Sequence, residues 1–278
     1  ICNFYKVEDN QLFLCAGSDV GIKSVFESFS DGGRIVSSHP SFPMYKVYSE
    51  LYNCEYFRIP YEKDYTLSME KILSNITDDT DLVILANPNS PMGEHKSFDE
   101  IRILLDQGVP VLIDEAYIEF SERDSIINEI NNYSNLFITR TFSKGFGAAG
   151  CRVGMVFSHK DNIELISKFR QMYEISGVSM RYCEFLLDNY GIVDSYIREV
   201  KEEKNKIVTM LKNYEVIDSD CNWIHFNNEI DNIDTIRVLD KHKVLVKYCS
   251  IPHDDRKNWC RLTIQPEMSN FDFIKELL

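Results

Sequence analysis

A lysine loop over residues 139–154 holds the side chains of this sequence that are best suited to chemistry. Its sequence, TRTFSKGFGAAGCRVG, places Thr141 and Ser143 just before Lys144, and Arg152 eight residues after that lysine. A lysine amine forms Schiff bases with carbonyl compounds, while hydroxyls and a guanidinium bind a phosphate dianion. The loop therefore indicates a carbonyl cofactor that carries a phosphate, such as pyridoxal phosphate.

Three further polar segments follow or join candidate strands: ANPNSPMG at 86–93, DEAY at 114–117, and Gly17-Ser18-Asp19. Ligands of an open α/β sheet bind outside the carboxyl ends of its strands, so we expect these segments to meet the lysine loop. The segment at 17–19 leads into a helix, whose first amides form a natural phosphate site. Each segment alone is more often a turn or a helix cap, so the prediction rests on their joint order.

The elements that must position these residues follow an α/β pattern. Candidate strands at 11–15, 34–38, 54–59, 81–86, 109–113, 135–139 and 152–157 alternate with helical patterns at 19–29, 43–52, 97–106 and 124–131. Such alternation predicts a mainly parallel central sheet flanked by helices.

The pattern changes after about residue 160. Helices are expected at 160–173, 179–190, 193–213 and from about 270, with strands at 222–226, 244–247 and 259–264. We expect a large cofactor-binding domain over 1–165 and a smaller C-terminal α+β domain over 166–278.

Composition excludes several classes of function. The net charge of −14 over 278 residues argues against nucleic acid and against an anionic membrane as partners. The eight cysteines include no C-x-x-C pair, which favours reduced thiols and a cytoplasmic setting. The six histidines show no metal-ligand spacing, no run is long enough to span a membrane, and no signal peptide is visible, so neither a metal nor a membrane is expected. Because the chain starts at Ile1, directly before a strand-like run, we expect an N-terminal segment to be missing from it.

The ordered motifs resemble those of the aspartate aminotransferase superfamily, the fold-type I enzymes that depend on pyridoxal phosphate. They look most like the histidinol-phosphate aminotransferase branch of that superfamily. The matching segments are GSD at 17–19, PSFPMY at 40–45, NPNSPMG at 87–93, DEAY at 114–117, RTFSK at 140–144, Arg152, and RLTI at 261–264.

The resemblance implies a role for each matching residue. Lys144 forms the internal aldimine and afterwards carries the proton between the substrate Cα and the cofactor. Asp114 pairs with the pyridinium nitrogen, and Tyr117 donates to the phenolic oxygen of the ring. The implied contacts with the cofactor phosphate come from Ser18 and Asp19 through their backbone amides, and from Thr141, Ser143 and Arg152. Phe42 is implied to stack on the ring face, and Arg261 and Lys247 to bind an anionic group of the substrate.

The sequence departs from the family motifs at four positions. Ser90 stands where the family has an asparagine that contacts the ring oxygen, although the neighbouring Asn89 could substitute for it, and Met92 replaces a threonine. Phe42 replaces a tyrosine and keeps only the stacking surface. Lys247 replaces an arginine, so a point charge takes the place of a planar fork and puts histidinol phosphate itself in doubt as substrate.

We therefore expect an aminotransferase that moves an amino group between glutamate and a small, phosphorylated or otherwise anionic substrate. A decarboxylase of an O-phospho amino acid is the nearest alternative, because both reactions use the same cofactor site. Two more distant hypotheses are a regulatory module that binds the cofactor without catalysis and a degenerate scaffold. The resemblance also implies a homodimer with its site at the interface, over which an N-terminal arm closes.

Overall fold

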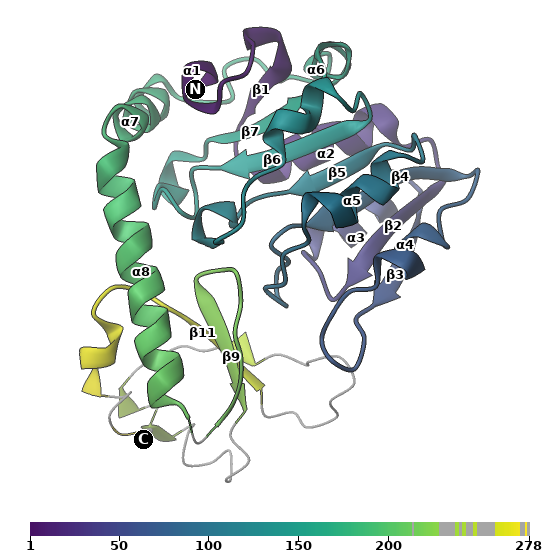
Figure 1. Ribbon diagram of the computed structural model, residues 1–278. Coiled ribbons are helices and arrows are strands. Elements are labelled where there is room, and N and C mark those ends of the chain that lie inside the picture. The colour runs from purple at the N-terminus through teal and green to yellow at the C-terminus, as the bar shows by residue number, and fades with distance from the viewer. Residues whose placement is uncertain are drawn as a thin grey trace.

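The computed structural model describes residues 1–212, 214–227 and 259–272, together with 237–238, 241–242, 247–248 and 276. Figure 1 shows two sheets, a large one built from residues 12–158 and a small one beneath it. The long helix α8 (Tyr190–Met210) runs from beside the large sheet down to the small one. The expected division into domains at residue 165 stays a prediction.

The large sheet has seven strands in the order β1-β7-β6-β5-β4-β2-β3. The strands are β1 (Leu12–Cys15), β2 (Arg34–His39), β3 (Glu55–Pro60), β4 (Thr80–Ala86), β5 (Val111–Asp114), β6 (Leu136–Thr141) and β7 (Gly154–Ser158). β7 is antiparallel to both of its neighbours, and the remaining pairs are parallel. The expected α/β fold with a mainly parallel sheet is therefore confirmed.

Helices cover both faces of this sheet. One face packs against α2 (Ser18–Phe29), α3 (Met44–Leu51) and α6 (Lys160–Ser167), and the other against α4 (Met69–Leu73), α5 (Phe98–Leu105) and α7 (Gly177–Asp188). β4 shows why both faces need cover, since Leu82 and Ile84 enter one hydrophobic core while Val83 and Leu85 enter the other.

The small sheet is antiparallel, with the order β10-β11-β9-β8. Its strands are β8 (Glu215–Ile217), β9 (Trp223–Asn227), β10 (Lys247–Tyr248) and β11 (Trp259–Thr263). Ile224 and Phe226 of β9 belong to the same core cluster as Val200 and Ile207 of α8. One face of the small sheet is thus buried against α8, which leaves the other face turned toward the large sheet.

Several expected elements differ from those observed. The helix expected at 124–131 is a 3-10 turn over Ile127–Asn131, because the Ser125 hydroxyl accepts a bond from the Ile127 amide and donates to Glu115. The helix expected at 160–173 ends at Ser167. The short elements α4 and β8 were not expected, because they are too short for a periodic pattern.

The remaining short segments are α1 (Cys2–Tyr5) and the 3-10 turns Asp9–Gln11, Ile118–Phe120, Ala149–Cys151 and Met268–Asn270. Most of the strand expected at 244–247 and most of the helix expected from 270 lie outside the described residues. Among the residues that the structure describes, no helix is long and apolar enough to cross a membrane.

Candidate active site

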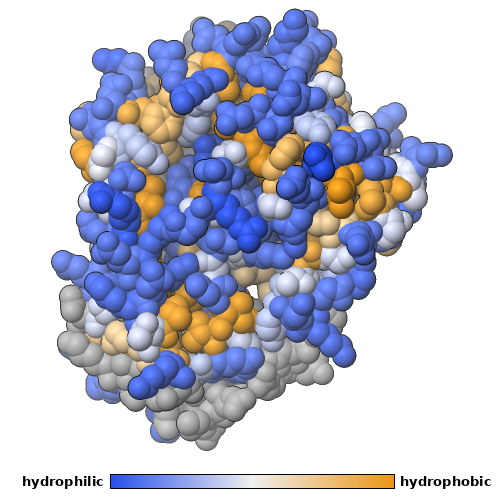
Figure 2. Space-filling model, viewed as in Figure 1, coloured by the Kyte–Doolittle hydropathy of each residue, from blue (hydrophilic) through white to orange (hydrophobic). Residues whose placement is uncertain are grey.

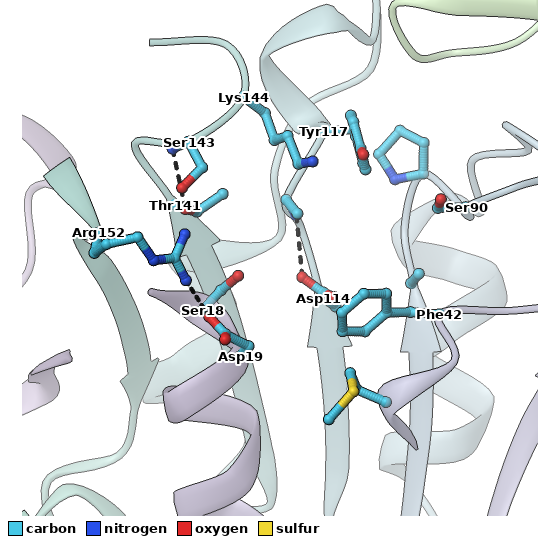
Figure 3. A pocket seen from close by; sticks show the side chains of 14 residues that line it. Ser18, Asp19, Phe42, Ser90, Asp114, Tyr117, Thr141, Ser143, Lys144 and Arg152 are labelled. Carbon is cyan, nitrogen blue, oxygen red and sulfur yellow. Dashed lines mark hydrogen bonds and ion pairs between the residues drawn. The ribbon is translucent and has the colours of Figure 1, made fainter. Parts of the chain in front are cut away.

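A cavity of about 280 Å³ lies at the carboxyl ends of the central strands of the large sheet. All ten residues that the sequence predicts around the cofactor line it: Ser18, Asp19, Phe42, Ser90, Asp114, Tyr117, Thr141, Ser143, Lys144 and Arg152. Figure 3 shows Arg152 and Ser143 at one end, Phe42 and Ser90 at the other, and Lys144 above Asp114 between them. Segments more than 130 residues apart in the sequence, such as Ser18 and Arg152, thus meet at one point.

Lys144 projects across the cavity toward Tyr117 (Figure 3). The Lys144 Nζ atom lies 4.9 Å from the centre of the Tyr117 ring. Tyr117 in turn meets the Trp223 ring edge to face, with 4.5 Å between the ring centres. The ammonium group is therefore held beside an aromatic ring that is itself packed against the small sheet.

Asp114 ends β5, is almost fully buried and accepts three hydrogen bonds. The Tyr45 hydroxyl donates to one carboxylate oxygen at 2.9 Å, while the Thr139 hydroxyl at 3.0 Å and the Ala116 amide at 3.2 Å donate to the other. Burial raises the pKa of Asp114, and these hydrogen bonds oppose the rise. The three bonds thus fix the carboxylate in place and offset part of the cost of burying its ionised form, which is the form that can partner a protonated ring nitrogen.

Tyr45 and Thr139 were absent from the residues expected at the site. Tyr45 belongs to the PSFPMY segment, but its hydroxyl reaches Asp114 only because α3 packs on the sheet face that also carries Leu112 of β5. Thr139 is the register partner of Asp114 in the β5–β6 pair. A sequence pattern predicts the two strands but not which of their residues stand opposite each other.

The end of the cavity where the sequence predicts the cofactor phosphate is built on the first turn of α2. An Arg152 Nη atom donates to the Asp19 carboxylate at 2.8 Å, which holds the guanidinium over the start of the helix. Gly17, with φ of 100°, precedes the helix, and a side chain there would overlap the Arg152 guanidinium. The sequence predicted that only the backbone amide of Asp19 takes part in the site. The structure adds the ion pair between the Asp19 side chain and Arg152.

Ser143 supplies an observation that favours an anion at this end. Its backbone amide donates to the Thr141 hydroxyl at 3.1 Å, but its own Oγ atom is buried and has no hydrogen-bond partner among the described residues. A buried hydroxyl without a partner costs free energy, and a phosphate beside Arg152 and the first amides of α2 would satisfy it. The lining of the cavity therefore fits pyridoxal phosphate.

Ser90 rather than Asn89 faces the cavity. The Asn89 side chain accepts a bond from the Met92 amide at 3.0 Å and donates to the Ser38 hydroxyl at 3.2 Å. These bonds hold the Asn89 side chain against its own loop and against the end of β2. Asn89 is therefore not placed to substitute for the asparagine that the family has at position 90.

A buried ionic cluster supports the lysine loop from beneath. Arg140 lies 3.5 Å from both Glu115 and Glu119 and stands over the Tyr5 ring, 5.0 Å from its centre. Burial raises the pKa of Glu119 to about 7, although the positive charge of Arg140 opposes the rise. Gly145 rests on Glu119, since a Cβ atom at position 145 would lie 2.6 Å from the Glu119 Cβ. The cluster thus fixes the position of the loop backbone next to Lys144.

Both predicted substrate residues belong to the small sheet, and Arg261 is not among the described residues that line the cavity. The Arg261 guanidinium stands over the Trp223 ring, with 4.9 Å between its carbon and the ring centre. Lys247 of β10 is the register partner of Arg261. Trp223 therefore links Arg261 to Tyr117 and to the wall of the cavity.

Comparison with known proteins gives consistent results. The sequence profile of "Aminotransferase class I and II" matches residues 1–273. A histidinol-phosphate aminotransferase from Bacteroides thetaiotaomicron is 33% identical over 203 residues, which cover 72% of this chain and 59% of that protein. One from Christiangramia forsetii is 29% identical over 97% of this chain and 78% of its own length. The chain thus spans only part of the length of these relatives.

Solved structures share the fold. The histidinol-phosphate aminotransferase from Clostridium acetobutylicum has a TM-score of 0.85 at 23% identity, covering 99% of this chain and 85% of that one. The enzyme of the same name from Sinorhizobium meliloti, in complex with pyridoxal-5'-phosphate, has a TM-score of 0.84 at 19% identity, covering 100% of this chain and 80% of that one.

Proposed function

Because this chain belongs to the class I and II aminotransferases, we propose that it moves an amino group between glutamate and a small, phosphorylated or otherwise anionic substrate. Pyridoxal phosphate is the cofactor. The observation that carries the proposal is the cavity in which Lys144, Asp114, Tyr117 and Arg152 meet. The names of the curated relatives support the choice of reaction.

Bound pyridoxal phosphate supplies a ring that accepts negative charge from the substrate Cα. Lys144 attaches the cofactor, and its amine then removes and returns the proton at the substrate Cα. Asp114 keeps the ring nitrogen protonated, which its three hydrogen-bond donors assist by stabilising the carboxylate. Tyr117 donates to the ring oxygen and lies against the Lys144 ammonium.

Residues at the two ends of the cavity hold the cofactor in position. Ser143, Thr141, Arg152 and the first amides of α2, at Ser18 and Asp19, bind its phosphate. Phe42 and Ser90 line the other end of the cavity, where Phe42 would stack on the ring and Ser90 would face its oxygen. Arg261 and Lys247 bind the anionic end of the substrate.

Half-transamination of the purified protein tests the reaction. Pyridoxal phosphate is added, and the visible absorbance of the bound cofactor is followed while amino acids and amino phosphates are supplied one at a time. We expect glutamate to remove this absorbance and to yield one equivalent of keto acid. Release of carbon dioxide from an O-phospho amino acid, without a keto acid, would show the alternative decarboxylase.

A lysine variant tests the assignment of the catalytic amine. Replacement Lys144→Ala is expected to abolish the absorbance band and to lower the rate by at least about 10²–10⁴-fold, because both attachment and proton transfer are lost. The exposed Lys160 at the start of α6 offers a control, and Lys160→Ala should leave both unchanged. Undiminished activity of Lys144→Ala would contradict the proposal.

We also propose a cytoplasmic homodimer. Large apolar side chains are exposed around α7 and the start of α8: Phe169, Met172, Tyr173, Val178, Tyr182, Phe185 and Ile192. Hydrophilic residues cover most of the face seen in Figure 2, where the apolar ones form separate patches. Large exposed apolar side chains that gather around one helix favour a partner there. Light scattering on the purified protein tests the dimer, and a monomeric mass would contradict it.

The cysteines among the described residues are all free thiols, which supports a reducing compartment.

A further inference from the structure

One face of the small sheet is turned toward the active site. Along β9, Trp223, His225 and Asn227 alternate with Ile224 and Phe226, which lie in the core beneath. Trp223 marks the direction of the outer face, because its ring contacts Tyr117 and its Nε1–H donates to the Pro91 carbonyl at 3.1 Å. His225, two residues along, shares this face.

His225 is fully buried on that face and lacks hydrogen bonds. Its exposed fraction is 0%, and neither ring nitrogen has a hydrogen-bond partner among the described residues. Its register partner on β11 is Arg261, whose Nε–H is also buried and has no hydrogen-bond partner in the part of the chain that the structure describes. Two neighbouring polar groups thus leave three hydrogen-bonding positions unused beside the site.

The charge state of His225 shows what would complete this arrangement. Burial, and then the positive charge of Arg261, lower the pKa of His225 to about 4. The ring is therefore neutral near pH 7, with one N–H donor and one acceptor nitrogen. An anion between the two side chains would accept from both and would favour additional proton binding by the imidazole.

We propose that His225 and Arg261 together bind the terminal anion of the substrate, and that His225 sets a preference for a phosphate monoester over a carboxylate. The proposal rests on the aminotransferase function given above. A guanidinium fork satisfies both oxygens of a carboxylate. A phosphate monoester has a third terminal oxygen and nearly a second negative charge. His225 can donate to this third oxygen, which a carboxylate lacks. Lys247, the register partner of Arg261 on β10, places a further basic residue on the neighbouring strand.

Two ligands that differ mainly in their end group test this preference. O-phospho-L-serine and L-glutamate are titrated against the holoenzyme, and apparent dissociation constants are taken from the absorbance change of the bound cofactor. We expect His225→Leu to weaken O-phospho-L-serine at least tenfold and L-glutamate less than twofold. Equal effects on the two ligands, or no effect on either, would overturn the proposal.

Thermal unfolding separates this role from a structural one. A histidine kept for its contacts would lower the melting temperature when it is replaced. A histidine kept for a ligand is unpaired in the free protein, so His225→Leu should raise the melting temperature by roughly 2–4 °C. A fall in the melting temperature together with an unchanged ligand preference would assign His225 to packing alone.

Two further variants complete the test. His225→Gln keeps an N–H donor and should retain most of the phosphate preference. If the phosphate preference of this variant fell to that of His225→Leu, the role given to the donor would be contradicted. Ile224→Val, on the opposite face of β9, should lower the melting temperature without changing the ratio of the two dissociation constants. If the unaltered protein binds no cofactor or fails to react with glutamate, the proposed function itself is wrong. If it reacts but shows no phosphate preference, only the role of His225 is wrong.

Discussion

At the scale of single residues, the function depends on groups that do not themselves touch the substrate. Asp114 can hold a charged ring nitrogen only if it stays ionised in a site where burial favours its neutral form. Three donors offset this effect, and the Tyr45 hydroxyl, buried and 2.9 Å away, makes the shortest of the three bonds. We therefore propose that Tyr45 is a positioning residue that acts through Asp114.

Replacement Tyr45→Phe tests this role. One hydrogen bond to a charged group contributes about 1.5–3 kcal/mol, so we expect pyridoxal phosphate to bind roughly 10- to 100-fold more weakly. The pKa of Asp114 should rise further, and the activity should fall as protonation of the carboxyl spreads to higher pH. Equilibrium dialysis measures the affinity, and Tyr133→Phe, far from the cavity, is the control. An unchanged affinity would show that Thr139 and Ala116 alone suffice.

At the scale of elements, loops are held at the strand ends by buried charge. Arg140 of β6 joins Glu115, just after β5, to Glu119 of the next turn, and Gly145 of the lysine loop rests on Glu119. Neither carboxylate could stay ionised in this place without the guanidinium. The cluster therefore ties the DEAY segment to the lysine loop, two motifs whose residues must act together.

Replacement Arg140→Met leaves both carboxylates buried without a cation. We expect a loss of about 3–5 kcal/mol in the free energy of unfolding at neutral pH, measured by urea denaturation. The raised pKa of Glu119 fixes the sign of the pH dependence. Stability is greatest below the unfolded pKa of about 4.3 and is lost as pH rises through about 7, so the variant should recover near pH 5. A deficit that does not vary with pH would contradict this account.

For His225 of β9 we expect a pH dependence of stability opposite to that of Glu119, with stability lost toward low pH. Its folded pKa of about 4 lies below the unfolded value of about 6.5, so this group leaves the stability unchanged with pH above 6.5 and lowers it progressively as pH falls from 6.5 toward 4. The expected loss is roughly 3 kcal/mol at most. His225→Leu should flatten the stability profile between pH 6.5 and 4, as followed by calorimetry. A profile as steep as that of the unaltered protein would assign the acid sensitivity to other groups.

At the scale of the whole molecule, the small sheet and the segment between β8 and β9 pack against the loop that follows β4. The Asp220 amide donates to the Gly93 carbonyl at 2.8 Å, and the Trp223 indole donates to Pro91. Gly93 has a φ of 81°, and a side chain there would overlap Ser219. The loop that carries Ser90 is thus shaped by contacts with both sheets, which explains why the segment needs a glycine at this point.

Replacement Gly93→Ala should therefore destabilise the protein and disturb Ser90 together. We expect a loss of at least about 1 kcal/mol in the free energy of unfolding, from positive φ and overlap, and weaker cofactor binding. Gly108 offers a matched control, because its φ of 77° is similar while no atom lies within 4 Å of a Cβ there. Gly108→Ala should cost only the backbone strain and leave cofactor affinity intact. Equal effects at both positions would argue that the contact with Ser219 is unimportant.

The sequence by itself determined the α/β fold and the ten residues around the cavity. Each of these residues belongs to a short motif at the end of a strand or at the start of a helix, and parallel strands bring such ends to one edge of the sheet. Order along the chain was therefore enough to predict that Lys144, Asp114 and Arg152 meet.

Only the tertiary structure decided which groups support them. The bond from Tyr45 to Asp114 spans 69 residues and that from Thr139 spans 25, and His225 faces Arg261 only through the register of β9 and β11. Register and helix packing are set by the fit of whole surfaces, which no short motif encodes. The partners of Asp114 and the polar pair on the small sheet thus became visible only once the chain was folded.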